Sequence, residues 1–238
     1  MLLQPEGGYR AGLDAVVLAA AIGVDPAQDA RIVDLGAGVG AVGLCLAARA
    51  PAVRVVLVER AAELAALAQR NIAANGLAAR ARVITADLTQ PAAVLEAAGL
   101  EGDSFDHVVA NPPYQTEGEG RMPTDPLKAG AHVMAAGGID RWVRTAARLA
   151  KAGGTATVIH RADALGELLA AFAGRFGAVT VRPVHPRLGE PAMRILVAGI
   201  KGSRAPLQLL PGLVVHEATG HGFTPQMQGI LRDGRPLT

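Results

Sequence analysis

Short apolar runs alternate with helix-length segments along most of this chain, and this alternation is what most constrains its fold. The spacing is that of βαβ units, which predicts a mostly parallel, doubly wound α/β sheet. The last two predicted strands follow each other without a helix, so we expect them to pair antiparallel at one edge. The predicted strands are 31–35, 54–58, 81–85, 106–110, 155–160, 178–184 and 193–200, and the predicted helices are 12–22, 41–50, 61–74, 92–98, 139–150 and 162–172.

The predicted strand 106–110 ends at a motif that cannot continue it, Asn111-Pro112-Pro113-Tyr114. Each proline lacks an N–H and holds φ at about −65°, so the strand must stop at Asn111. An amide, a backbone carbonyl and an aromatic ring are therefore left at the carboxyl end of a strand. Ligands of open α/β sheets bind at this edge, which predicts a functional site there. We expect the next segment, 115–130, to be a mobile surface loop beside the site.

Composition sets broad limits on the class of protein. The chain has 238 residues, half of them apolar, which suffices to bury the core of one large domain. It contains no apolar run of about eighteen residues and no signal-peptide pattern, so the default expectation is a soluble cytoplasmic protein. The single cysteine, Cys45, excludes an internal disulfide and is expected in the core, and no Cys/His cluster has metal-ligand spacing.

A glycine-rich turn follows the first predicted strand and contains Gly36, Gly38 and Gly40. Such a turn lets the backbone approach a ligand closely and presents N–H groups at the start of the next helix. Together with Ala41, the turn also satisfies the relaxed dinucleotide pattern, so this feature alone leaves NAD open as a ligand.

Acidic residues lie at the ends of three successive predicted strands, and they narrow the choice of ligand. Asp34 precedes the glycines, where a carboxylate would repel a pyrophosphate but attract the ammonium of an amino-acid moiety. Glu59 is placed to accept hydrogen bonds from ribose hydroxyls, and Asp87 from the amine of adenine. A single acid at a strand end can simply cap the next helix, but three in succession favour S-adenosyl-L-methionine.

These motifs in this order resemble the class I S-adenosylmethionine-dependent methyltransferases over roughly residues 9–200. The resemblance implies a seven-stranded sheet in the order 3-2-1-4-5-7-6 with the seventh strand antiparallel. It implies a single domain over 1–238, with 1–23 as a segment that covers the cofactor and 203–238 as a C-terminal tail. The residues expected to bind the cofactor are Tyr9, Arg10, Asp34, Gly36, Gly38, Gly40, Glu59, Asp87, Leu88 and Asn111.

Within this class the chain resembles the bacterial valine-tRNA adenine-N6 methyltransferases. The resemblance rests on two segments, Gln4 to Leu18 and Arg182 to Gly202. It implies RNA, most simply a tRNA near its anticodon, as substrate and partner, but this target is inherited by analogy. The oligomeric state is left open.

The Asn-Pro-Pro-Tyr motif has a chemical rationale that does not depend on the family. The lone pair of an exocyclic amine on adenine is delocalised into the ring, so the nitrogen is a poor nucleophile. If the Asn111 oxygen and the Pro112 carbonyl accept its two hydrogens, the lone pair turns toward the incoming methyl group. Tyr114 can stack on the base. We expect Asn111, Pro112, Pro113 and Tyr114 to form the catalytic motif, without a metal.

Basic residues are concentrated in the last quarter of the chain. Residues 175–238 carry eight Arg and Lys against three acids, whereas 1–174 carry fifteen against eighteen. A basic region suits a polyanion such as RNA, although scattered solvated arginines are an equally good explanation of charge alone. The candidate phosphate contacts are Arg182, Arg187, Arg194, Lys201 and Arg204.

Several alternatives stay open at this point. A glutamine amide of a peptide release factor presents the same two hydrogens to the motif, and guanine N2 in ribosomal RNA is a further substrate. An NAD-dependent oxidoreductase or a non-catalytic binding module are alternatives of a different class. Asp14 is expected to hold the N-terminal segment or the helix entry, Asn71 to brace helix and turn, and Trp142 to lie in the core, while the six histidines suggest no catalysis.

Overall fold

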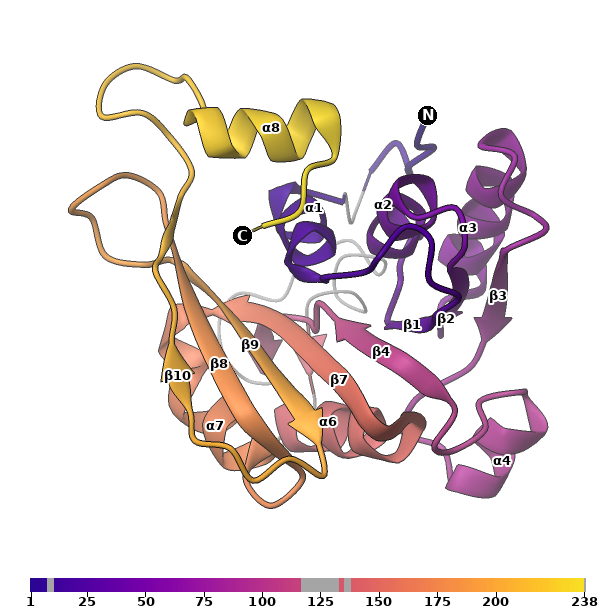
Figure 1. Ribbon diagram of the computed structural model, residues 1–238. Coiled ribbons are helices and arrows are strands. Elements are labelled where there is room, and N and C mark those ends of the chain that lie inside the picture. Colours follow the sequence, from indigo (N-terminus) through magenta and orange to yellow (C-terminus); the bar gives the residue numbers. More distant parts are fainter. Residues whose placement is uncertain (8–10, 117–132, 135–137, 238) are drawn as a thin grey trace.

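A computed structural model describes residues 1–7, 11–116, 133–134 and 138–237 of the chain. Among these residues, a nine-stranded mixed sheet forms the centre of the molecule, and helices cover both of its faces (Figure 1). The predicted segment 115–130 lies outside the described residues from 117 onward.

The elements follow the predicted alternation closely. The helices are α1 (Leu13–Ala21), α2 (Ala41–Arg49), α3 (Ala62–Ala74), α4 (Ala92–Ala97), α6 (Gly138–Leu149), α7 (Leu165–Phe172) and α8 (Pro225–Asp233), with a 3₁₀ turn at Ala162–Ala164. The strands of the main sheet are β1 (Arg31–Leu35), β2 (Arg54–Glu59), β3 (Ala81–Thr85), β4 (Phe105–Ala110), β7 (Ala150–Arg161), β8 (Phe176–His185), β9 (Arg194–Lys201), β10 (Gln208–Leu209) and β11 (Leu213–Val214). A separate parallel pair joins β5 (Gln115–Thr116) to β6 (Val133–Met134).

The strand order confirms the predicted topology. The path runs β3-β2-β1-β4-β7-β9-β8, which is the order 3-2-1-4-5-7-6 when these strands are numbered along the chain. The seventh of them, β9, pairs antiparallel with both β7 and β8. Leu35 lies opposite both Val58 and Ala110 in the parallel register. The carboxyl ends of β1, β2 and β4 therefore lie side by side.

Alternation along each strand divides the core between the two faces of the sheet. Ile32 of β1 packs on the face covered by α1, α2 and α8, whereas Val33 and Leu35 pack on the face covered by α4, α6 and α7 (Figure 1). Successive side chains of a strand point to opposite faces. The nearly continuous apolar sequence of β1 follows from burial on both sides.

The predicted tail extends the same sheet. The short strands β10 and β11 pair parallel with β8. Helix α8 begins at a Thr224 cap, whose side chain accepts a hydrogen bond from the Met227 N–H, and Met227 is buried in the core beside α1. The Leu237 N–H donates to the carbonyl of Ala20 at 2.8 Å. The division of the chain into one domain with a covering segment and a tail stays a prediction.

One expectation about the core is wrong. Cys45 was predicted to be a small core residue, but it is exposed. The neighbours of Cys45 on α2, Leu44 and Leu46, are buried against the sheet. Because a helix turns by about 100° per residue, Cys45 falls on the outward side of α2.

Asn71 on α3 contacts the glycine turn, as predicted, and also the N-terminal segment, which was not predicted. Its side chain is fully buried on α3. The Asn71 amide donates to the carbonyl of Leu3 at 2.9 Å and to that of Val39 in the glycine turn at 3.0 Å. The Asn71 oxygen accepts from the Leu3 N–H at 2.6 Å. One amide thus satisfies three backbone groups from two distant segments.

These contacts predict a loss of stability in Asn71→Ala. The substitution leaves partly buried backbone groups of Leu3 and the buried carbonyl of Val39 without this partner, so the free energy of unfolding should fall by about 1–3 kcal/mol. Urea denaturation measures this change. Asn75→Ala is the control, since Asn75 also binds the N-terminal segment, at Met1, but is exposed, and its loss should cost less than about 1 kcal/mol. Equal losses in both variants would contradict a bracing role for Asn71.

Candidate active site

The glycine turn after β1 adopts a backbone that few other residues tolerate. Gly36, Gly38 and Gly40 have φ angles of +65°, +56° and +88°. Side chains at these positions would be strained, because L residues rarely occupy the left-handed region. The Ala37 N–H donates to the carbonyl of Val58 at 2.9 Å, which ties the turn to the end of β2. The turn therefore leads into the start of α2, and its backbone lies at the carboxyl edge of the sheet.

Trp142 packs directly against this turn, and the sequence did not indicate that role. A Cβ atom at Gly36 would lie 2.4 Å from the Trp142 ring. Trp142 lies near the start of α6 and is half-buried rather than a fully buried core residue. Leu88, one of the predicted cofactor-binding residues, packs on the same apolar cluster. Trp142 and Leu88 thus both pack on this apolar cluster, Trp142 against Gly36 and Leu88 next to Asp87 in the sequence.

Asp34 lies beneath the turn in a fully buried position at the end of β1. It accepts a hydrogen bond from the Gly43 N–H of α2 at 3.1 Å. Burial raises the pKa of Asp34 to about 7, the Gly43 hydrogen bond opposes this rise, and the charge of Glu59 adds to it. A cationic group beside Asp34 would restore its negative charge.

Glu59 and Asp87 lie at the ends of the next two strands, at the same edge of the sheet. The two oxygens of Glu59 accept from the Gly38 N–H at 2.9 Å and from the Ala61 N–H at 2.8 Å. Each carboxylate oxygen has two lone pairs, so Glu59 can also accept from ribose hydroxyls. Burial acts to raise the pKa of Asp87, but hydrogen bonds from Thr89 and the charges of Arg60 and Arg141 outweigh it, and the pKa is lowered.

This donor and acceptor set fits S-adenosyl-L-methionine. A buried carboxylate suits the ammonium of the methionine part, an acid at the end of β2 suits the ribose, and the ionised acid after β3 suits the adenine amine. The described residues among those predicted to bind the cofactor lie at this one edge, and their role in binding stays a prediction. Tyr9 and Arg10 lie outside the described residues.

The Asn-Pro-Pro-Tyr motif is held by a cluster of side chains from distant parts of the chain. The Tyr114 hydroxyl lies 2.7 Å from an Asp14 carboxylate oxygen and 2.7 Å from the side-chain amide of Asn111. Arg194 donates from Nε to the same Asp14 oxygen at 3.0 Å, and its guanidinium lies over the Tyr114 ring, 4.7 Å from the centroid. Burial, followed by the charge of Asp14, raises the pKa of the Tyr114 hydroxyl.

His160 is a site residue that the sequence did not reveal. It is 4% exposed at the end of β7, and its ring meets Tyr114 in a T-shaped contact with centroids 5.0 Å apart. Nε2 lies 3.4 Å from the carbonyl oxygen of Pro113, and burial lowers the pKa of His160. Nδ1 has no hydrogen-bond partner among the described residues. In the sequence, His160 could have been found as the last residue of the predicted strand 155–160. The predicted strand order places this strand beside the one that ends at the Asn-Pro-Pro-Tyr motif.

The predicted phosphate contacts do not form one patch. Arg194 is engaged with Asp14 and Tyr114 in the site itself. Lys201, at the other end of β9, donates to Asp103 at 2.5 Å. A strand rises by about 3.3 Å per residue, so Lys201 lies about 23 Å along β9 from Arg194. Arg187 donates to the carbonyls of Glu217 and Gly220, and Arg182 to that of Pro211. Contact of any of them with RNA stays a prediction.

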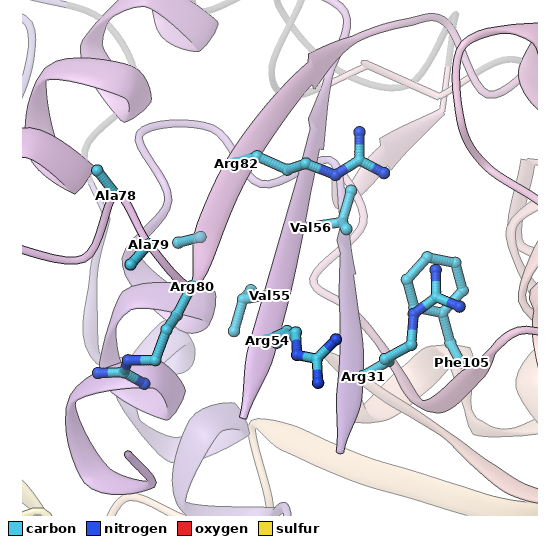
Figure 2. A pocket seen from close by; sticks show the side chains of 10 residues that line it. Arg31, Arg54, Val55, Val56, Ala78, Ala79, Arg80, Arg82 and Phe105 are labelled. Atoms are coloured by element: carbon cyan, nitrogen blue, oxygen red, sulfur yellow. The ribbon is translucent and has the colours of Figure 1, made fainter. Parts of the chain in front are cut away.

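A separate hollow opens at the amino edge of β1, β2 and β3, opposite the site (Figure 2). Its basic lining residues are already engaged within the protein. Arg54 pairs with Asp29 at 2.5 Å, and Arg31 lies over the Phe105 ring at 5.0 Å. Arg80 donates to backbone carbonyls that include Ala47 at 3.0 Å. We therefore place the candidate site at the carboxyl edge and not at this hollow.

Comparison with known proteins agrees with this geometry. The family model of the methyltransferase small domain matches residues 14–181, from the start of α1 into β8. The chain belongs to this family. The cofactor of this methyltransferase is therefore S-adenosyl-L-methionine, which decides between the ligands that the glycine turn leaves open. The family membership also decides against an oxidoreductase.

The relatives of this methyltransferase carry more than one activity in their names. The release factor glutamine methyltransferase of Mycolicibacterium smegmatis is 35% identical over 171 residues, which are 69% of this chain and 57% of that protein. The tRNA1(Val) (adenine(37)-N6)-methyltransferase of a Shewanella species is 35% identical over 111 residues, 47% of this chain and 44% of that protein. The chain thus spans about half the length of these curated relatives.

A solved structure resembles this methyltransferase over almost the whole chain. It is that of a predicted O-methyltransferase from Agrobacterium tumefaciens, which is 37% identical and superposes with a TM-score of 0.78. The superposition covers 94% of this chain and 98% of that one. Among the described residues, no group of His, Cys, Asp and Glu could hold a metal ion, and no helix could cross a membrane.

The contact between Gly36 and Trp142 predicts a specific packing defect. Gly36→Ala should lower the free energy of unfolding by about 2–4 kcal/mol, from backbone strain and overlap with the ring. Gly76→Ala is the matched control, because Gly76 has a similar φ of +68° but open space around its Cβ position, and it should cost about 1 kcal/mol. Adding Trp142→Leu to Gly36→Ala should relieve the overlap and recover the part of the stability that the overlap costs. Equal losses of unfolding free energy in the Gly36 and Gly76 variants would show that the contact with the Trp142 ring does not affect stability.

The raised pKa of Asp34 predicts how stability depends on pH. The ordinary pKa of 3.8 applies to the unfolded chain, and the folded value is about 7, so the folded protein binds this proton more tightly. The stabilisation is complete below about pH 4 and is lost as the pH rises through about 7. Urea denaturation without cofactor should show wild type losing stability over this range relative to Asp34→Asn, which keeps an acceptor for Gly43 but does not titrate. Parallel pH curves for the two proteins would contradict the assignment.

Proposed function

We propose that this methyltransferase acts on the exocyclic N6 amine of an adenine in RNA, most simply a tRNA adenine near the anticodon. One observation carries the proposal: Asn111 follows β4 directly beside the glycine turn, because Ala110 pairs with Leu35. A methyl donor held at the turn and a planar nitrogen held at Asn111 would therefore be neighbours. The motif contains no thiol, carboxylate or strong base, which a different type of methyl acceptor would need for its activation.

The proposed chemistry depends on hydrogen-bond acceptors. The Asn111 side-chain oxygen and the Pro112 carbonyl accept the two hydrogens of the amine, which turns its lone pair out of the plane of the base. When bound, the cofactor supplies an already activated methyl group on its sulfonium. The amine nitrogen would form a bond to this carbon as the carbon–sulfur bond breaks, and the nitrogen would then lose a proton to water. Positioning alone can contribute about 7–11 kcal/mol to such a step.

Tyr114 supports the planar group beside these acceptors. Its ring is held by Arg194 on one side and contacts His160, and its hydroxyl is hydrogen bonded. A side chain restrained in this way offers a fixed aromatic surface to a base or amide plane. A base inside a duplex cannot reach such a site, so the target adenine must be single-stranded or flipped out.

The net-positive last quarter of the chain and the similarity to a tRNA adenine-N6 methyltransferase support RNA as the partner. The second candidate is the amide nitrogen of a glutamine in a protein, which the similarity to release factor glutamine methyltransferases favours. Both substrates present a planar nitrogen with two hydrogens. The same clamp therefore serves either of them.

A labelling experiment separates the two substrates. The purified protein is incubated with tritiated S-adenosyl-L-methionine and either bulk tRNA or soluble protein from cells that lack the enzyme. We expect label in tRNA, and N6-methyladenosine after digestion to nucleosides. Label in protein alone would overturn the RNA proposal and favour glutamine. Methylated guanosine in the digest would point to the guanine alternative.

Asn111→Ala tests the amine clamp in the same assay. Loss of one acceptor should abolish transfer, whereas calorimetry should still detect cofactor binding, since most of the residues expected to hold the cofactor lie in the glycine turn and at the acids and not at Asn111. Asn75→Ala, at the exposed C-cap that follows α3, should keep normal transfer. Full activity of the Asn111→Ala protein would show that the clamp mechanism is wrong.

A further inference from the structure

The hydroxyl of Tyr114 lies within hydrogen-bonding distance of two side-chain atoms assigned as oxygens, those of Asp14 and Asn111, but has one hydrogen to donate. It lies 2.7 Å from Asp14 Oδ2 and 2.7 Å from the atom assigned as Asn111 Oδ1. Both distances are those of good hydrogen bonds between oxygens, and each such bond needs a hydrogen between its atoms. The tyrosine can supply one of the two bonds. The other must come from its partner.

Asp14 cannot be the donor in its contact. Its Oδ2 atom also accepts from Nε of Arg194 at 3.0 Å, and both side chains are about three-quarters shielded from solvent. An ion-paired carboxylate has no hydrogen to give, and it is a stronger acceptor than a neutral amide. The Tyr114 hydrogen therefore points at Asp14.

Asn111 must then donate to the tyrosine oxygen through its NH₂ group. The two ends of an asparagine amide have nearly the same shape, and the hydrogen-bond network decides which end is which. Among the described residues, the Asn111 amide makes no other side-chain hydrogen bond, so exchanging its two ends breaks no other contact there. With the NH₂ group on Tyr114, the Asn111 oxygen lies at the opposite end of the amide.

We propose that Asp14 and Arg194 are positioning residues for methyl transfer, and that they set the orientation of the Asn111 amide through Tyr114. Hydrogen bonds run from Arg194 to Asp14, from Tyr114 to Asp14 and from Asn111 to Tyr114. This chain leaves the Asn111 oxygen to accept a hydrogen of the substrate amine. The inference rests on the proposed amine clamp and holds for an adenine or a glutamine substrate.

Amide orientation can be measured without any substrate. The chain contains three asparagines, Asn71, Asn75 and Asn111, so ¹⁵N-asparagine labelling gives three side-chain NH₂ signals. The signal that is lost in Asn111→Ser belongs to Asn111. We expect one of its hydrogens to exchange slowly with solvent in wild type and rapidly in Tyr114→Phe. Equal exchange in these two proteins would overturn the proposed orientation.

Asp14→Asn should have the same effect on this signal. An asparagine at position 14 can donate to the tyrosine oxygen, which frees the Tyr114 hydrogen to bind the Asn111 oxygen and removes the reason for the original orientation. Asp163→Asn is the control, because Asp163 forms an exposed ion pair with Arg161, the register partner of Arg194 on β7. It should leave the Asn111 signal unchanged. An unaltered signal in Asp14→Asn would also overturn the proposal.

A double-mutant cycle tests the consequence for transfer to bulk tRNA. Tyr114→Phe and Asp14→Asn should each lower kcat by roughly 10- to 100-fold, with cofactor affinity unchanged. The double variant should be no slower than Tyr114→Phe alone, since both changes break the same chain. Arg194→Lys should keep more activity than Arg194→Met. Multiplicative losses in the double variant would show that Asp14 acts independently of Tyr114.

The two proposals fail in different ways. If tRNA accepts no methyl group but the Asn111 signal responds as expected, the substrate assignment is wrong and the orientation stands. The cycle can then be repeated with the labelled protein substrate. If tRNA is methylated but the Asn111 signal does not respond to Tyr114→Phe or Asp14→Asn, the function stands and the positioning role is wrong.

Discussion

The parallel register among β2, β1 and β4 is the constraint on which the rest of the site depends. Leu35 pairs with Val58 on one side and with Ala110 on the other. The glycine turn, Glu59 and Asn111 therefore emerge at one edge, although 75 positions separate Gly36 from Asn111 in the sequence. Because side chains alternate along a strand, a shift of one residue in this register would turn Asp34 to the other face and disrupt the core together with the site.

A second layer of contacts stiffens this edge from outside the central strands. Asp14 on α1 and Arg194 on β9 meet at Tyr114, and His160 on β7 packs against the same ring. Burial makes these polar contacts consequential, because a partly desolvated tyrosine and carboxylate lose more when a partner is removed than they would in water. Methyl transfer by positioning needs such rigidity more than it needs acids or bases.

Much of the fold could be predicted from local patterns. Strands β1 and β3 begin and end at the predicted residues, and the sheet order was predicted through the resemblance. Strand β7 begins at Ala150 rather than at the predicted residue 155, because Gly153 and Gly154 lie within the strand, where its register with β4 shifts. The two-residue strands β10 and β11 were missed, because pairing with β8 and not propensity makes them strands.

The sequence by itself determined the α/β alternation, the glycine turn, the acids at the strand ends and the motif that stops β4. These features follow from backbone preferences and spacing that act over a few residues. Only the tertiary structure decided which side chains meet at the motif. Tyr114 lies 100 positions from Asp14, and Arg194 lies 180 positions from Asp14, so their contact depends on sheet order and helix packing. For the same reason Arg194, predicted to contact phosphate, is engaged at the motif, and His160 was overlooked.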